Sequence, residues 1–325
     1  MTEHTMPTND DVLIVGAGPM AIEYTKVLKD LGYRPIVIGR GERSANQFQE
    51  ATGIPAAPGG LRPWLAKAQL PLPARAIVAN SEKWIGESAR DLMAAGVKHL
   101  LLEKPGGFDP DDVLAVQACA RQHGARVDIG YNRRFYASVE AAREQIAADG
   151  GVRSFNFEFT EWSHVIGAIE KEEGVKEQWF LSNSTHVIDL AFHLGGRPTR
   201  WSAYASGGLP WHPLASVFSG AGETDQGALF SYQANWEAPG RWGVEILTQQ
   251  HRLIFRPMEK LQVQKIGSVA IEPVLLPHDL DERFKPGLYK QAQAFLGLAP
   301  ADHLPTIDQQ VEMLPVYMRM RAQAI

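Results

Sequence analysis

The chain has 325 residues, of which 45% are hydrophobic and 21% charged, so it can bury a sizeable core and divide into two domains. Its formal net charge of -5 gives no electrostatic reason to bind nucleic acid or an anionic membrane, and we expect neither partner. No signal-peptide pattern, no apolar run approaching the roughly 20 residues of a membrane span and a single cysteine, Cys119, together predict a cytoplasmic protein.

Short apolar runs alternate with segments of helical period in the first 130 residues. The runs begin at Val12, Ile36, Ala76, His99 and Val127. This alternation is typical of a parallel α/β sheet. Asp109 followed by Pro110 predicts a helix N-cap and first helical residue, whereas residues 53–73 are rich in Pro and Gly, so a short strand and a short helix are expected there.

The pattern changes beyond Gly130. A helix is predicted around Val139–Ala148, and strand-like stretches follow it at Val152, Trp201, Ala228 and Gly243. This arrangement favours an α+β domain with a mostly antiparallel open sheet.

The predicted fold class is therefore α/β, in two domains. Residues 1–130 are expected to form a Rossmann domain with a doubly wound parallel sheet, and residues 131–325 an α+β domain for substrate binding and oligomerisation. The final helical stretch, Ile307–Ala324, is expected to pack back onto the first domain.

A glycine motif follows the first apolar run directly. Residues 16–21 (GAGPMA) fit the G-x-G-x-x-G/A fingerprint of dinucleotide-binding domains. Gly16 would permit the tight turn, Gly18 would let a pyrophosphate approach the backbone, and a helix beginning at Pro19 and Met20 would offer its free N–H groups. A simple glycine turn is the alternative, but strand, motif and helix are in register, so we predict a dinucleotide cofactor.

The acid that selects NAD is missing from the end of the second apolar run. Gly39 and Arg40 stand there instead, roughly 20 residues after the motif. Arg40, with Arg43 or Ser44, is suited to hold a 2′-phosphate by charge-assisted hydrogen bonds, so NADP is predicted as the cofactor in preference to NAD. The alternative is an arginine that is only solvated.

A Glu-Lys-Pro triplet, residues 103–105, follows the apolar run that begins at His99. It therefore lies at the carboxyl end of a predicted parallel strand, where open α/β sheets bind ligands. With the glycine motif, the stretch 131–135 (YNRRF) and a His-x-x-Asp pair at His186, this sequence resembles the glucose-fructose oxidoreductase, inositol dehydrogenase and rhizopine-catabolism (Gfo/Idh/MocA) family.

The resemblance implies an NAD(P)-dependent oxidoreductase, commonly a homodimer or homotetramer, whose triplet lysine lies beside the nicotinamide and the substrate hydroxyl. Lys104 would take that role, and the bond before Pro105 would often be cis. A partly desolvated lysine keeps a donor aimed at an oxygen whose charge changes during hydride transfer. Glu103, Pro105 and Asn80, which follows the third apolar run, complete the predicted cofactor contacts; an ordinary surface lysine is the alternative for Lys104.

Residues 184–194 begin with cap-type residues and end before two glycines, which predicts a capped helix. His186, Asp189 and His193 form a polar stripe on this otherwise apolar helix. We predict His186 as the general acid/base and Asp189 as the residue that orients the substrate or the histidine. A hydrogen-bonded core histidine is the alternative for His186 and the expected role of His193, and the spacing does not fit a zinc site, so no metal is predicted.

The family pattern Asp-x-Gly-x-His-x-x-Asp is matched only at its histidine and final aspartate. Ser182 stands in place of the first aspartate, so Ser182 or Asn183 must substitute for it, or the chemistry differs. Glu161 continues the face on which three phenylalanines alternate, so Glu161 and its neighbour Trp162 are further candidates for substrate contact.

Arg133 and Arg134 are candidates to bind an anionic group of the substrate, although such arginines also commonly pair with acids across a domain interface.

The predicted function is hydride transfer between a nicotinamide and a carbinol or ketone carbon of a small sugar derivative, such as a sugar phosphate or nucleotide sugar of surface-polysaccharide biosynthesis. Within enzymes, the alternative is a ketone or imine reductase of a specialised biosynthetic pathway. A non-catalytic NAD(P)-sensing regulator is the alternative from another class, against which the retention of Lys104 and His186 argues.

Overall fold

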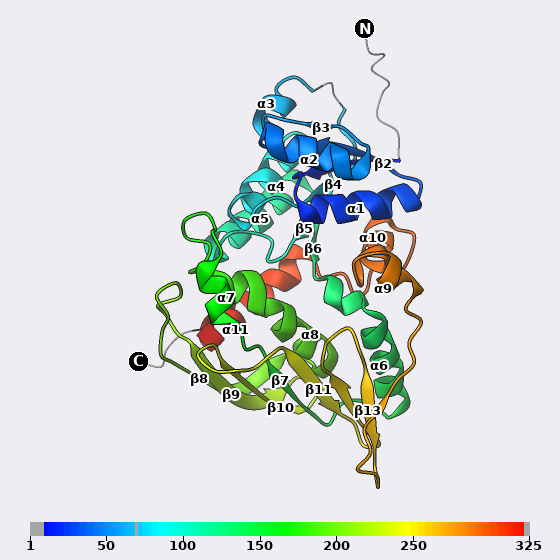
Figure 1. The fold of residues 1–325 in the computed structure, drawn as a ribbon, viewed down its shortest axis with the longest axis vertical. Helices are drawn as coiled ribbons and strands as arrows, with labels where there is room; N and C mark the ends of the chain where they lie inside the picture. The colour runs from blue at the N-terminus through cyan, green and yellow to red at the C-terminus, as the bar shows by residue number, and fades with distance from the viewer. Residues whose placement is uncertain (1–9, 69–70, 322–325) are drawn as a thin grey trace. The chain divides into compact units, whose positions relative to one another are not determined.

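The computed structural model describes residues 10–68 and 71–321, and its chain forms two compact units (Figure 1). Unit 1 comprises the residues up to Tyr131 together with Arg283–Glu312, and unit 2 comprises Asn132–Glu282 and the residues from Met313 onward. A division into independent domains at residue 130 remains a prediction. Residues 283–312, which are distant in sequence, complete the first unit.

Unit 1 is built on a six-stranded sheet in the order β3-β2-β1-β4-β5-β6, in which every pair is parallel. Its strands are β1 (Asp11–Val15), β2 (Arg34–Ile38), β3 (Ala56–Ala57), β4 (Arg75–Val78), β5 (His99–Glu103) and β6 (Arg126–Gly130). Its helices are α1 (Pro19–Asp30), α2 (Glu42–Thr52), α3 (Leu61–Leu65), η1 (Glu82–Trp84), α4 (Ile85–Ala94), α5 (Pro110–His123) and α10 (Leu288–Leu296). The predicted Rossmann sheet is confirmed.

The central strands are apolar on both faces, as a parallel sheet covered by helices requires. Val12, Leu13 and Ile14 of β1 are completely buried. The strand order reverses between β1 and β4, and the carboxyl ends of these two strands therefore form the crevice where sheets of this type bind ligands.

Local sequence signals in unit 1 are confirmed in detail. Asp109 caps α5, because its carboxylate accepts a hydrogen bond of 2.8 Å from the backbone N–H of Asp112, and Pro110 is the first helical residue. In the Pro/Gly-rich stretch, the described residues form the two-residue strand β3 and the five-residue helix α3.

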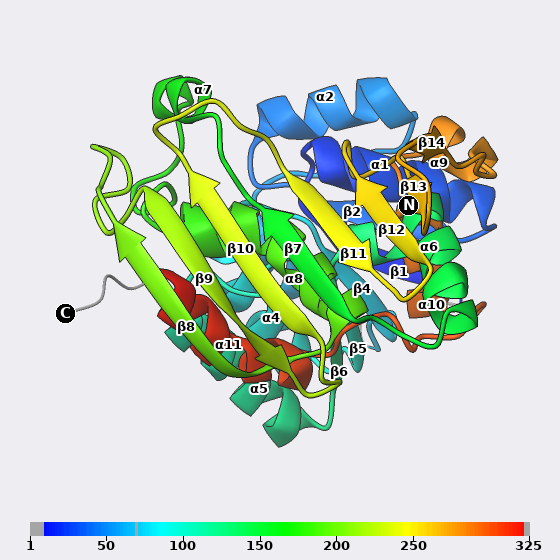
Figure 2. The ribbon, with the colours of Figure 1, turned by 90° about the horizontal axis from the view of Figure 1, so that it is seen from below.

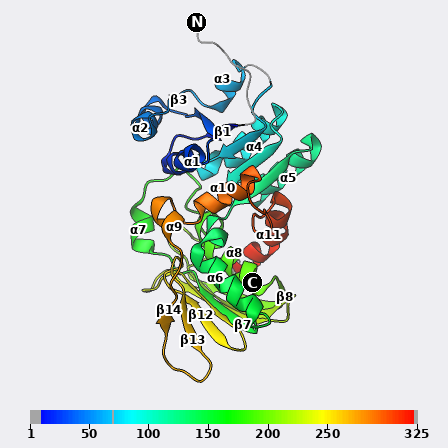
Figure 3. The same cartoon turned by 90° about the vertical axis from the view of Figure 1, so that its right-hand side faces the viewer.

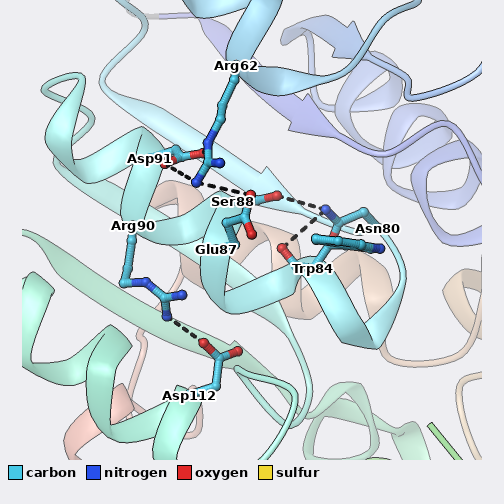
Figure 4. A network of polar contacts seen from close by, with 8 residues as sticks. All are labelled: Arg62, Asn80, Trp84, Glu87, Ser88, Arg90, Asp91 and Asp112. Carbon is cyan, nitrogen blue, oxygen red and sulfur yellow. Dashed lines mark hydrogen bonds and ion pairs between the residues drawn. The ribbon is translucent and has the colours of Figure 1, made fainter. Parts of the chain in front are cut away.

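Helices α4 and α5 pack closely and are cross-linked by charge. A Cβ atom at Gly86 would lie 2.1 Å from a carboxylate oxygen of Asp112, so a larger residue there would displace the Asp112 side chain. Arg90 of α4 pairs with that same Asp112, and Arg62 pairs with Asp91 at 2.7 Å (Figure 4). These contacts fix the helix that follows β4.

The segment Arg283–Glu312 attaches to unit 1 through specific hydrogen bonds. Gln291 of α10 donates to the Tyr24 hydroxyl at 2.8 Å, and the Tyr289 hydroxyl donates to Asp30 at 3.0 Å. Gln310, in the first half of α11 (Ile307–Arg321), donates to the backbone oxygen of Pro105 at 3.0 Å. The last three residues of the predicted final helix, 322–324, lie outside the described residues.

Unit 2 contains an eight-stranded sheet in the order β14-β13-β12-β11-β7-β10-β9-β8, mostly antiparallel, with β7 and β10 as a parallel pair. Its strands are β7 (Ser154–Glu158), β8 (Pro198–Ser206), β9 (Val217–Thr224), β10 (Leu229–Asn235), β11 (Gly243–Leu247), β12 (His251–Phe255), β13 (Gln262–Lys265) and β14 (Glu272–Pro273). Its helical elements are η2 (Asn132–Phe135), α6 (Ala137–Ala148), α7 (Ser163–Ala168), η3 (Phe180–Ser184), α8 (Thr185–Gly195) and α9 (Asp279–Arg283), the last of which ends at the unit boundary. The expected α+β arrangement is confirmed, with α6 and α8 on one face of the sheet (Figures 2 and 3).

Aromatic packing holds α8 on the sheet. Phe155, Phe157 and Phe159 lie on one face of the sheet, as their spacing predicts, and all three are buried. The Phe192 ring of α8 meets Phe155 and Phe157 edge-on, at ring-centroid distances of 6.0 and 5.5 Å. A Cβ atom at Gly195 would lie 2.2 Å from the Phe155 ring, so the end of α8 approaches the sheet as closely as its backbone allows.

None of the helices among the described residues is both long and apolar enough to cross a membrane.

We expect Gly195→Ala to lower the free energy of unfolding by about 1–3 kcal/mol, because the new methyl group overlaps a buried ring that its neighbours hold in place. Gly167→Ala is the matched control, since its nearest atom, in Trp211, lies at an ordinary contact distance of 3.4 Å. Denaturant unfolding followed by circular dichroism measures both. Equal stability of the two variants would contradict the close packing of α8.

Candidate active site

The glycine motif forms the turn between β1 and α1. Its two glycines have different surroundings. Gly16 has φ +124°, and a Cβ atom there would lie 2.4 Å from the Ala79 carbonyl oxygen. Gly18 has nothing within 4 Å of the corresponding position. The fold therefore excludes a side chain at Gly16, whereas the open space above Gly18 suits a group from outside the chain, such as a pyrophosphate.

The N-terminus of α1 begins beside this open space. Gly18 is the N-cap and supplies no side-chain hydrogen bond, and Pro19 is the first helical residue. Met20 is half-buried, and Ala21 is completely buried against the sheet. The first N–H groups of the helix thus remain available to an anion, with the positive end of the helix dipole behind them.

Asn80 follows β4 and carries a buried acceptor with no partner. Its side-chain nitrogen donates to the Ser88 hydroxyl at 2.9 Å and lies 3.5 Å from the Trp84 carbonyl oxygen (Figure 4). Its Oδ1 atom is buried and accepts no hydrogen bond from any described residue. Such an acceptor costs free energy unless a ligand or water donates to it, and its place beside Gly16 fits a hydroxyl or amide of a bound dinucleotide.

Arg40 lies at the end of β2, where the sequence predicts it. Its guanidinium carbon is 5.0 Å from the centroid of the Trp84 ring. The Ser44 hydroxyl donates to the Gly41 carbonyl oxygen at 2.9 Å. Gly39 is explained by packing, because a Cβ there would come within 3.1 Å of the Ala17 side chain. The structure therefore places the exposed guanidinium of Arg40 and the Ser44 hydroxyl just beyond this strand end, with Glu42 between them in sequence as the first residue of α2.

The Glu-Lys-Pro triplet ends β5, and the Lys104–Pro105 peptide bond is cis. Glu103 accepts a hydrogen bond of 2.8 Å from the Tyr24 hydroxyl, and burial together with the Glu103 charge raises the pKa of Tyr24 well above its usual value. Glu103 and Pro105, which were predicted to contact the cofactor, thus have partners inside unit 1 that fix the strand end, and Lys104 between them is half-buried.

The capped start predicted for α8 is wrong. Ser184 has helical dihedral angles, φ −66° and ψ −24°, and its side chain makes no cap. A π-helical turn, η3, runs directly into α8 instead. The Ser184 hydroxyl is directed elsewhere, because it donates to a carboxylate oxygen of Glu161 at 2.9 Å. Single π turns within helices frequently occur at functional sites.

Glu161 is a buried carboxylate that accepts hydrogen bonds from two residues of this turn. It is 3% exposed, and the side-chain nitrogen of Asn183 lies 3.0 and 3.1 Å from its two oxygens. Burial raises the pKa of Glu161, and its hydrogen bonds from Ser184 and Asn183 oppose that shift in part. Glu161 and Asn183, two predicted substrate residues, are therefore brought together, and Ser182 is buried in the same turn.

Asp189 and Arg134 form a buried bidentate ion pair. The two nitrogen–oxygen distances are 2.8 and 2.6 Å, and both side chains are largely shielded from solvent. Arg134 thus occupies both oxygens of Asp189, which was expected to orient substrate or histidine. The pair ties η2 to α8 and gives Asp189 a positioning role on the helix that carries His186.

His186 belongs to a cluster of aromatic and cationic side chains. Its ring centroid lies 6.1 Å from that of Trp242, and the Arg133 guanidinium carbon lies 4.8 Å from the same indole. The guanidinium carbon of Arg241 lies 5.5 Å from the centroid of the Trp242 ring and 4.5 Å from that of Trp162. Trp162 is 47% exposed, and its indole nitrogen donates to the backbone oxygen of Gly240 at 3.0 Å.

Arg241 and Trp242 were missed from the sequence. The only available signal was an arginine–tryptophan pair directly before a predicted strand, which is too common to single out. His193 is half-buried, and among the described residues no group of histidine, cysteine and acidic side chains is arranged to hold a metal ion.

Residues 11–131 match the GFO_IDH_MocA family model, described as an oxidoreductase family with an NAD-binding Rossmann fold. No curated protein is detectably similar to the chain in sequence.

Solved structures share the fold over almost the whole chain at low sequence identity. A UDP-N-acetylglucosamine 3-dehydrogenase from Acidithiobacillus ferrooxidans has a TM-score of 0.71 and 17% identity, with 96% of both chains covered. A levoglucosan dehydrogenase in complex with NADH and L-sorbose has a TM-score of 0.75 and 18% identity, with 95% of both covered. A putative NADPH-dependent oxidoreductase from Desulfitobacterium hafniense has a TM-score of 0.74 and 15% identity, with 96% of this chain and 94% of that chain covered.

The raised pKa of Glu161 predicts a specific pH dependence of stability. Between the usual glutamate pKa and the raised one, the native protein binds more protons than the unfolded chain, so stability falls as pH rises through this window. We expect Glu161→Gln to remove that part of the slope while retaining an oxygen that accepts hydrogen bonds. Glu144→Gln, at an exposed position of α6, is the control.

Denaturant unfolding at a series of pH values provides the measurement. An unchanged slope in Glu161→Gln would show that Glu161 does not titrate in this window.

Proposed function

We propose that this chain, whose residues 11–131 match the GFO_IDH_MocA oxidoreductase family model, transfers hydride between a nicotinamide cofactor and a carbinol or ketone carbon of a small sugar derivative. The similar structures include dehydrogenases of a nucleotide sugar and of levoglucosan, which supports a sugar derivative as the substrate class.

The switch point of the parallel sheet carries this proposal. Three features there suit a dinucleotide: the side-chain-free turn at Gly16, the open space above Gly18, and the unpartnered Oδ1 of Asn80. The fold itself requires only the first of these features. A bound ligand accounts for the other two, since it would fill the space and donate to the acceptor.

The bound nicotinamide supplies the hydride acceptor or donor, and the protein supplies the groups that manage the substrate oxygen. Lys104 is half-buried at a strand end held by Glu103 and Pro105, which suits a donor that stays directed at a developing alkoxide. His186 is 8% exposed, and we propose that it accepts the hydroxyl proton during oxidation and returns it during reduction.

Arg40 and Ser44 support NADP as the preferred cofactor, because a 2′-phosphate would meet a guanidinium and a hydroxyl where NAD-selective domains carry an acid. We expect NADP to bind more tightly than NAD, and Arg40→Ala to reduce the preference about tenfold or more. Lys26→Ala removes another exposed positive charge of unit 1 and is the control. Fluorescence titration of both oxidised cofactors measures the ratio; tighter binding of NAD by the wild type contradicts the assignment.

Lys104→Ala and His186→Ala test the catalytic roles separately. Each variant is expected to bind the cofactor nearly as the wild type does, and to lose roughly 10²-fold or more in turnover, because each loses one positioned hydrogen-bonding or proton-transfer group. His193→Ala, on the same helix, is the matched control and should retain most activity. The assay uses a panel of polyols, sugar phosphates and nucleotide sugars, after circular dichroism has confirmed folding.

Wild-type turnover in folded, cofactor-bound Lys104→Ala and His186→Ala would overturn these roles. If the wild type turns over no sugar but reduces other ketones or imines, the second enzymatic function takes its place. If it binds NAD(P) and turns over no carbinol, ketone or imine, a nucleotide-sensing regulator becomes the better account. Cytoplasmic location and a homodimeric or homotetrameric state remain predictions.

A further inference from the structure

Arg133 is a half-buried arginine whose charge is not neutralised by an ion pair. Its Nε atom is buried, and among the described residues its side chain has no hydrogen bond or ion pair. The centroid of the Trp242 ring lies 4.8 Å from its guanidinium carbon. Burial lowers the pKa of Arg133, and the attraction of Tyr136, Glu259 and Glu161 opposes that shift only in part.

The adjacent arginine shows what a structural arginine looks like in this turn. Arg134 is also largely buried, but Asp189 binds it through both carboxylate oxygens. The two arginines are adjacent in sequence, so they differ in whether a carboxylate pairs with them and not in the segment that carries them. Arg134 holds η2 to α8, whereas the buried Nε of Arg133 donates to no acceptor within the described part of the chain.

Trp242 and Arg241 place two more hydrogen-bond donors near Arg133. The indole nitrogen of Trp242 is buried and donates to no described residue. Arg241 stacks on Trp242 and Trp162, again with no ion pair in the described parts of the chain, and its charge further lowers the pKa of Arg133. Arg241 is exposed, whereas Arg133 is not, and an anion near both guanidinium groups would attract each of them and offset their mutual repulsion.

The nearby carboxylates do not accept hydrogen bonds from Arg133. Glu161 attracts Arg133 through space, but both its oxygens already accept hydrogen bonds from Asn183, and one also from Ser184. Glu259 likewise acts on Arg133 only through space and accepts a hydrogen bond from Tyr136. Residues 10–68 and 71–321 therefore contain no acceptor that completes the cluster.

We propose that Arg133, Arg241 and Trp242 form a subsite for an anionic group of the substrate, a carboxylate or a phosphate. Planar guanidinium groups match both oxyanions, and the indole N–H adds a third donor. His186 lies against the same indole, so the subsite adjoins the proposed acid/base. The inference deepens the proposed function, since it assigns the substrate a negative charge, and it rests on that function for the identity of the reacting group.

Binding measurements test the subsite without turnover. Quenching of tryptophan fluorescence and isothermal titration are recorded with D-gluconate, glucose 6-phosphate and neutral glucose, each with and without NADP. We expect at least one anionic probe to bind the wild type about tenfold or more tightly than glucose, with affinity that falls as salt is added. The two anionic probes distinguish a carboxylate from a phosphate as the favoured group.

Arg133→Gln should weaken binding of the preferred anion about tenfold or more and leave glucose and NADP binding unchanged, because a charge-assisted hydrogen bond is lost. Trp242→Phe keeps an aromatic ring but removes the indole N–H donor, so we expect a smaller loss of anion affinity. Arg153→Gln, an exposed arginine at the start of β7, is the matched control. If Arg133→Gln fails to fold, Arg133→Lys keeps the charge without the planar fork and should still weaken the anion.

Equal affinity of the wild type for glucose and for both anions overturns the subsite, as does unaltered anion binding in Arg133→Gln or Arg133→Lys. If the wild type binds NADP but no anion, the subsite fails and the proposed function stands. If it binds the anion through Arg133 but neither NADP nor NAD, the proposed function fails and the subsite stands.

Discussion

The backbone contact between Gly16 and the Ala79 carbonyl oxygen is the constraint on which the nucleotide site depends. It allows no side chain at Gly16, and it brings the ends of β1 and β4 together at the point where the strand order reverses. From that approach follow the start of α1 at Pro19 and the position of Asn80, whose amide is held by Ser88 of α4. The Arg90–Asp112 ion pair in turn ties α4 to α5 (Figure 4).

Unit 2 distributes its buried charges by a consistent physical rule. Where a charged group serves the fold, the chain provides its partner, as Asp189 does for Arg134 and Asn183 for Glu161. The buried indole N–H of Trp242 has no acceptor among the described residues. Such a donor raises the free energy of the unliganded protein, and a ligand that accepts from it would lower that free energy. In the proposed subsite, the two adjacent arginines of one turn therefore have different roles: Arg134 supports the fold and Arg133 is assigned to the ligand.

Much of the fold was predictable because the parallel strands of unit 1 are continuous apolar runs, and the glycine motif depends on residues adjacent in sequence. Strand β9 was missed because Gly220 and Gly222 interrupt its pattern: they are glycines so that Tyr232 and Trp201 of neighbouring strands can pack against them. The start of α8 was misplaced because serine favours a cap, and only the tertiary contact with Glu161 redirects the Ser184 hydroxyl. Trp242 joins the site through contacts with His186 and Arg133, which are far from it in sequence and invisible to local pattern.

The return of residues 283–312 to unit 1 has a consequence during translation. The first 131 residues leave the ribosome without α10, so the Tyr24 hydroxyl beneath the Glu103 strand end lacks its Gln291 partner until most of the chain has been made. Unit 2 lies between the two parts of unit 1 in sequence, and all of Asn132–Glu282 emerges before unit 1 can close. The order of synthesis is therefore not the order of completion: the unit that begins first is finished only after the body of the second has been synthesised.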